Sequence, residues 1–129
     1  MVTSQRLFIS ADTSVAAAST ETDGTDFTSA QLDTKHAILG SLTCYILGAN
    51  AGSTGNVTFN FVQYDTLRES WDTVAYVSVI CALNGVTAVQ KSITFYPDMV
   101  KLKLLSITNA DATYAATCNA VLTTKEKLS

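Results

Sequence analysis

The stretch Thr73–Tyr96 reads TVAYVSVICALNGVTAVQKSITFY and contains the strongest strand and turn signals in the chain. Its first part, Thr73–Leu83, is nearly continuous in β-branched and aromatic residues, a composition typical of a strand. It stops at Asn84-Gly85, two residues that tolerate positive φ and that form the strongest short signal for a β-hairpin. We therefore expect Val86–Tyr96 to return as the antiparallel partner strand.

Strand patterns continue on both sides of this stretch. Val57, Phe59 and Phe61 alternate with other residues at period two, the pattern of a half-buried strand. Further strands are expected at Arg6–Ser10, Lys35–Leu47, Val100–Leu104 and Thr113–Thr124, separated by turns at Gly48–Gly55, Pro97-Asp98 and Asn109-Ala110-Asp111. With about seven to eight strands and no helical stripe, the sequence predicts an all-β chain, an antiparallel β-sandwich of jelly-roll or Ig-like type.

The chain has 129 residues, a length that predicts a single domain over 1–129. Residues 11–26 differ from the rest, because Ala16-Ala17-Ala18 lies among Ser, Thr, Asp and Gly without a repeating apolar stripe. We expect an irregular N-terminal arm or long loop there. Long ordered loops usually carry function, so this arm is a candidate contact element, with a mobile linker as the alternative.

Charged residues make up only 15% of the chain, against roughly 25% in ordinary soluble domains, and about one residue in four is Ser or Thr. The surface must therefore be polar mainly through hydroxyl groups. The formal net charge of -3 argues against a nucleic-acid partner, which would need clustered Lys and Arg. Lys101 and Lys103 share one strand face, which we interpret as a solvated face rather than a phosphate site.

The expected localisation follows from the lengths of the apolar runs and from the use of cysteine. No apolar run approaches the roughly 18 residues of a membrane helix, and the N-terminus lacks the apolar core of a signal peptide. The cysteines, Cys44, Cys81 and Cys118, are odd in number and lie inside apolar strand-like runs. We expect them to be free, small buried side chains in a chain made in a cytoplasm, with no membrane partner.

The chain has few residues that could support catalysis or bind a metal ion. The single histidine, His36, has no nucleophile elbow to serve, so we expect no enzyme and no catalytic residues. One His and three strand-embedded Cys do not provide paired zinc ligands, and we expect neither a metal nor another cofactor. Asp23-Gly24-Thr25-Asp26 could offer oxygens to calcium, but the calcium-loop pattern is missing and a side-chain-capped turn is favoured.

The only tryptophan, Trp71, lies beside mixed charges. An aromatic ring flanked by carboxylates on a loop could bind a sugar by stacking and hydrogen bonding, with Asp65, Glu69, Trp71 and Asp72 as the candidate glycan-binding residues. The alternative is that Trp71 anchors the loop over one end of the sandwich, and this reading is favoured because no second aromatic is adjacent in sequence.

Taken in order, these features resemble a class of small virion proteins of tailed bacteriophages. The matching segments are a Ser/Thr/Ala-rich opening (Ala11–Asp26), a Gly/Ser/Thr turn (Gly52–Gly55), a V-T-F-x-F-x-Q-x-D strand (Val57–Asp65), an acidic turn with Trp (Glu69–Asp72), a Pro-bounded hairpin (Asn84–Pro97), a V-K-L-K-L strand (Val100–Leu104) and an Ala/Thr-rich strand (Thr113–Leu122). Where such proteins commonly show Ser-x-Asp-Gly before the Trp, this chain has Thr66-Leu67-Arg68-Glu69.

The resemblance implies a structural role in the virion, as a capsid decoration (cement) protein that stabilises a bacteriophage capsid. Its partner would be the major capsid protein or another virion protein. Closed symmetry, with a homotrimer favoured, would let each subunit cover the sheet edge of the next. The contact residues would come from the arm, at Asp12, Thr13, Glu21, Asp23 and Asp26. The alternative is a carbohydrate-binding tail or adhesin module.

Overall fold

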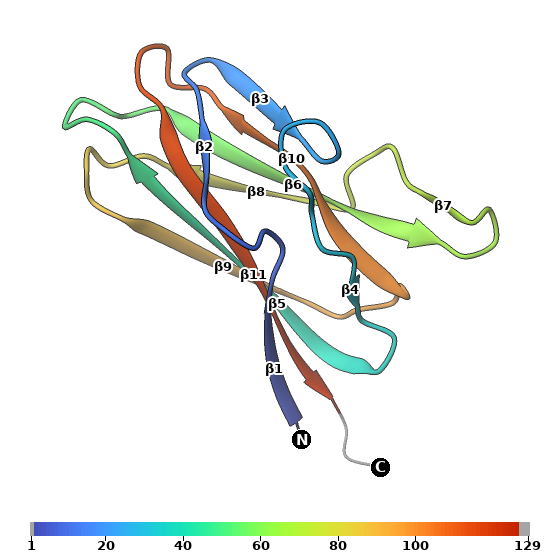
Figure 1. Cartoon of the computed structure of the whole chain (residues 1–129). Coiled ribbons are helices and arrows are strands. Elements are labelled where there is room, and N and C mark those ends of the chain that lie inside the picture. Colours follow the sequence, from blue (N-terminus) through green and yellow to red (C-terminus); the bar gives the residue numbers. More distant parts are fainter. Residues whose placement is uncertain (1, 127–129) are drawn as a thin grey trace.

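Two antiparallel β-sheets pack face to face in the computed structural model, which describes residues 2–126 (Figure 1). Sheet A contains β1 (Val2–Leu7), β2 (Thr13–Val15), β5 (Ala37–Gly48), β9 (Val89–Phe95) and β11 (Ala116–Glu126). Sheet B contains β3 (Ser19–Thr22), β4 (Leu32–Asp33), β6 (Asn56–Asp65), β7 (Ser70–Trp71), β8 (Val77–Ala82) and β10 (Lys101–Asn109). The described residues include no helix, and the predicted antiparallel β-sandwich is confirmed.

The central strands of each sheet are the longest. In sheet A the order is β1-β11-β5-β9, with β2 also beside β11. In sheet B, β10 and β6 lie in the centre, with β3 and β4 on one side and β7 and β8 on the other. The predicted strands all occur with shifted ends, the opening strand being Val2–Leu7 rather than Arg6–Ser10, while the short strands β2, β3, β4 and β7 were not expected.

The core forms where alternating side chains of the two sheets meet. Leu42 and Ile46 on β5 are fully buried, as are Phe59 and Phe61 on β6. The ring of Phe8, just beyond β1, packs 5.0 Å from that of Phe61, measured between centroids. Because burying each such side chain contributes about 1.5–3 kcal/mol, this contact layer is the main source of stability.

The three cysteines belong to this core. Cys44 on β5, Cys81 on β8 and Cys118 on β11 are free and buried, as the sequence predicts. Burial raises the pKa of all three thiols, that of Cys118 to about 12, because the ionised form loses its hydration. They are inert packing groups in the folded chain.

The expected hairpin at Asn84-Gly85 is wrong as a strand pairing. A turn does form there, with the Thr87 N–H donating to the Asn84 carbonyl at 3.0 Å and Gly85 at φ 58°. However, β8 pairs with β6 in sheet B, whereas β9 pairs with β5 in sheet A. The turn therefore carries the chain from one sheet to the other, because burying both apolar faces requires the two strands to face each other across the core.

The connections from β5 to β6 and from β10 to β11 are among the others that cross between the sheets. These two connections lie at the same end of the sandwich as the β8–β9 turn (Figure 1). They bond to one another, since the Gly85 N–H donates to the Ser53 carbonyl at 2.9 Å and the Ala49 N–H to the Ala115 carbonyl at 3.2 Å. This end is consequently a single hydrogen-bonded unit.

The expectation of an irregular arm over 11–26 is wrong for the residues that form β2 and β3. Strand β2 pairs with β11 in sheet A, and β3 pairs with β10 in sheet B. Val15 is fully buried in the core. The segment therefore closes one side of the sandwich by passing between the two sheets. The pattern was hidden because each strand is too short to show a repeating alternation.

Candidate functional site

The polar residues proposed as arm contacts bond within the chain. Asp12 accepts a hydrogen bond from the Asn119 side chain at 2.9 Å. The Thr13 hydroxyl donates to the Glu21 carboxylate at 2.8 Å, which joins β2 of sheet A to β3 of sheet B. These bonds hold the segment against both sheets, and Asp12 stays exposed.

Asp23 and Asp26 shape the turn that follows β3. Asp26 accepts the Thr22 N–H at 2.9 Å, so the predicted side-chain-capped turn is present. Asp23 accepts the Ser29 N–H at 2.7 Å and forms an ion pair with Lys103 at 3.0 Å. Both side chains of that pair are largely buried, with exposed fractions of 12% and 15%, so the pair fixes this loop against β10.

Trp71 lies on the outer face of sheet B, where the register of β6 and β7 places Tyr64 directly opposite it. The two rings meet edge to face at 5.3 Å between centroids. The ammonium of Lys101 lies 4.2 Å from the centre of the Tyr64 ring, and that of Lys103 lies 4.8 Å from the centre of the Trp71 ring. Such cation–π contacts stabilise the β6–β7 hairpin and cover part of the two aromatic rings.

Tyr64 was missed in the sequence because it is seven residues from Trp71 and joins it only through strand register. Lys101 and Lys103, expected on a solvated face, are half-buried over these rings. The available sequence signal was the alternation itself, which places Tyr64 on the outward side of β6 together with Asn60.

Two other candidate glycan-binding residues, Asp65 and Glu69, belong to the turn that connects β6 to β7. Asp65 accepts the N–H groups of Leu67 and Arg68, at 2.9 and 3.2 Å, and pairs with the Arg68 guanidinium at 3.2 Å. The Arg68 N–H is the main cause of a lowered pKa of the Asp65 carboxyl. Glu69 is exposed at φ 51°, closing the same turn. Asp65 and Glu69 therefore build the loop that presents Trp71.

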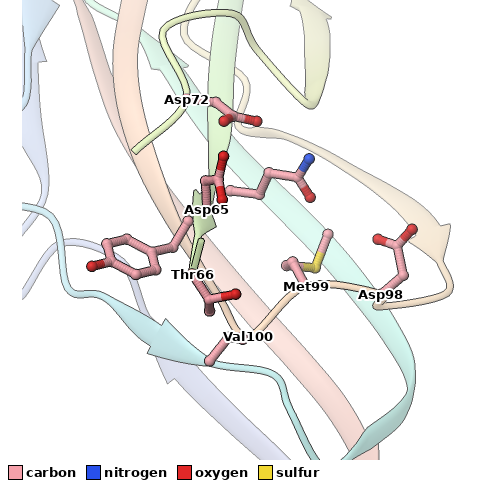
Figure 2. A pocket seen from close by; sticks show the side chains of 8 residues that line it. Asp65, Thr66, Asp72, Asp98, Met99 and Val100 are labelled. Atoms are coloured by element: carbon pink, nitrogen blue, oxygen red, sulfur yellow. The ribbon is translucent and has the colours of Figure 1, made fainter. Parts of the chain in front are cut away.

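A polar cavity of about 270 Å³ opens beside this hairpin (Figure 2). Asp65 and Asp72 lie near each other, and Asp98 lies beyond Met99. The lining residues are Gln63, Tyr64, Asp65, Thr66, Asp72, Asp98, Met99 and Val100. Among residues 2–126 no group of three or more His, Cys, Asp or Glu side chains is arranged to hold a metal ion. The cavity thus unites Asp65 and Asp72 but excludes Glu69 and Trp71.

The outer face of sheet A is different in character. Its side chains alternate with the buried positions of β5 and β11, and include Leu39, Ser41, Thr43, Tyr45, Leu47, Thr117, Val121, Thr123 and Lys125. The flanking strands add Leu7, Gln5, Ser92 and Thr94. Lys125 is the charged side chain among these positions, and Asn119, which also faces outward on β11, donates a hydrogen bond to the Asp12 carboxylate at 2.9 Å. This face of mixed hydroxyl and apolar groups contains a hollow of about 160 Å³ around Ser41.

No protein-family model matches the chain, and no curated protein is similar to it in sequence. Among solved structures, the PBSX exported protein XepA is similar with a TM-score of 0.57 and 7% identity, over 98% of this chain and 38% of that one. A xylan-binding domain of Paenibacillus barcinonensis Xyn10C is similar with a TM-score of 0.53 and 11% identity, over 97% of this chain and 94% of that one. A chain of infectious bursal disease virus, Gx strain, is similar with a TM-score of 0.53 and 10% identity, over 95% of this chain and 31% of that one.

These likenesses show that the β-sandwich fold is shared with proteins of different roles. The chain spans well under half of XepA and of the virus protein, and nearly all of the xylan-binding domain. In the described part of the chain, no helix is long and apolar enough to cross a membrane.

Proposed function

We propose that this chain is a structural virion protein that decorates and stabilises a bacteriophage capsid as a symmetric oligomer, associating through the outer face of sheet A. It is supported by the scarcity of charge on that face, where Lys125 and the Asp12 carboxylate bonded to Asn119 stand among hydroxyl, amide and apolar side chains. The shared fold of a chain from infectious bursal disease virus is compatible with it.

A face with few charged groups loses little favourable hydration when a partner covers it. The centres of protein interfaces are depleted in charged residues, since an ion loses hydration on burial and regains little unless it is paired. Leu39, Tyr45, Leu47 and Val121 supply apolar area on this face, and Thr43 bonds to Ser92 at 2.7 Å within it. Its hydroxyl groups are already paired within the sheet or can meet a partner, so burial leaves few orphaned groups.

A single charge at the centre of this face tests the proposal. Thr43→Glu would bury an unpaired carboxylate if the face is covered, and should abolish both oligomer formation and binding to particles that lack the protein. Thr66→Glu, in the exposed β6–β7 loop, is the control with an equal charge change. Light scattering gives the oligomeric state and co-sedimentation gives particle binding. A Thr43→Glu protein that assembles and binds normally would exclude sheet A as the contact face.

A second candidate is carbohydrate binding at the Tyr64–Trp71 pair. It is favoured by the second aromatic ring that the register supplies, and by the fold shared with a xylan-binding domain. A glycan array should then detect binding that Trp71→Ala removes. Tyr96 lies away from this pair and is 78% exposed, so Tyr96→Ala is the matched control and should leave binding intact. An array without a ligand would remove this candidate.

A further inference from the structure

Strand β8 forms an edge of sheet B, pairing with β6 alone among the described strands. Residues 73–90 carry no charged side chain. Its register with β6 is continuous from Val77 to Ala82, without a bulge. Ile80 is 49% exposed and Val74, just before the strand, is 77% exposed. An uncharged, regular and apolar edge of this kind is a template to which another strand can add.

The other long edge strands contain charged residues that oppose the addition of another strand. Strand β1 contains Arg6 and strand β9 contains Lys91, whereas β8 contains no charged residue. Charged residues on edge strands, particularly inward-pointing lysines, are a common means of preventing strand addition. Protection of β8 must therefore come from a neighbouring element.

That element is β9 in the opposite sheet. Lys91 pairs in register with the buried Cys44, so its side chain starts on the inward side of β9. Its Nζ donates a hydrogen bond to the Ile80 carbonyl at 3.0 Å. The lysine thus spans the open side of the sandwich, from the edge of sheet A to the edge of sheet B.

The Ile80 carbonyl is an acceptor of the free edge. The Leu83 N–H donates to the Gly55 carbonyl at 2.9 Å, which shows that Leu83 directs its main-chain groups toward β6. In an antiparallel strand these directions alternate from one residue to the next. Val77, Val79 and Cys81 consequently bond to β6, and Ile80 directs its carbonyl outward.

We infer that Lys91 guards the β8 edge against pairing with the β8 strand of a second copy of this chain. A strand added there would have to donate its own N–H to Ile80 and displace the ammonium, breaking a charge-assisted hydrogen bond. It would also cover the ammonium without offering it a carboxylate, because residues 73–90 of the added copy are uncharged. The second copy is the relevant partner because its β8 has the same regular, uncharged edge.

The test replaces the ammonium while keeping the aliphatic stem. Lys91→Met should form β-rich aggregates several-fold faster than the unmodified chain, measured by light scattering and thioflavin fluorescence. Lys91→Arg keeps a charged donor and should behave as the unmodified chain does. Lys35→Met removes an equal charge from an exposed turn and should have no effect. Equal aggregation of the Lys91→Met and Lys35→Met proteins, or none in either, would overturn the inference.

A second variant separates edge pairing from loss of folding. Ile80→Lys places a charge on β8 itself, so the double variant Lys91→Met/Ile80→Lys should return to the low aggregation of the unmodified chain. Persistent aggregation of the double variant would show that β8 is not the edge involved, and would overturn the inference. The same series in the Thr43→Glu background removes the contribution of the proposed sheet A interface.

Discussion

The carboxylate of Asp111 organises the end of the sandwich where the β5–β6 and β10–β11 connections cross between the sheets. One oxygen accepts the N–H groups of Thr113 and Tyr114, at 2.9 and 2.8 Å, and the other accepts those of Thr54 and Gly55, at 3.0 and 3.2 Å. The Tyr114 N–H, followed by the other donors, holds the pKa of this carboxyl well below its usual range. One ionised side chain thus joins the β10–β11 and β5–β6 connections.

This geometry predicts a pH dependence of stability. Because the pKa of Asp111 is lower in the folded chain than in the unfolded chain, its stabilising contribution is complete above the unfolded value of about 3.9 and is lost as the pH falls below it. Asp111→Asn should therefore lower the melting temperature near neutral pH, by about 5 °C or more, and the difference should shrink below about pH 4.

Thermal denaturation between neutral and strongly acidic pH measures this effect. Asp98→Asn removes a carboxylate from the exposed rim of the cavity and serves as the charge-matched control. If Asp111→Asn and the unmodified chain lose stability in parallel as the pH falls, the carboxylate does not have the role assigned to it.

Among the elements, the crossing connections leave little space for side chains. Gly48 ends β5 beside the β8–β9 turn, and a Cβ built on it would collide with the Gly85 carbonyl and lie 2.6 Å from Cβ of Ser53. Ser53 is itself fully buried. A residue larger than glycine would force two connections apart, so close contact between backbones explains Gly48 better than turn conformation does.

Gly48→Ala should consequently destabilise the chain by about 1–3 kcal/mol or more, the usual cost of overpacking a closely packed site. Gly52→Ala, in the same connection, is the matched control. Its Cβ would meet the side chains of Tyr114, at 3.1 Å, and of Asn50, at 3.5 Å, and no backbone atom at a shorter distance, so the change should alter stability by less than about 1 kcal/mol. Urea denaturation compares the two, and equal losses would mean that the crossing connections are less closely packed than described.

At the scale of the whole molecule, the core spans both sheets and contains all three thiols. Cys44 and Cys118 lie in sheet A and Cys81 in sheet B. Burial and the raised pKa of each thiol oppose the reactive thiolate form. Their reactivity should therefore report opening of the sandwich as a whole.

We expect a thiol reagent such as dithionitrobenzoate to leave the native chain unmodified at neutral pH and to modify all three cysteines in denaturant. The rates should rise together with urea, because all three cysteines are buried in the same core. Rapid reaction of one thiol under native conditions would indicate local opening near that strand and would contradict a uniformly closed core.

Sequence patterns predicted the strand class, most strand positions, the turn at Asn109–Asp111 and the burial of the cysteines, because alternation and turn chemistry are local properties. Long-range strand pairing determines that Asn84-Gly85 connects different sheets, that residues 13–15 and 19–22 join the sheet edges, and that Tyr64 lies beside Trp71. These features depend on which distant strand each segment meets. That choice follows from burying both apolar faces at once, which no window of sequence contains.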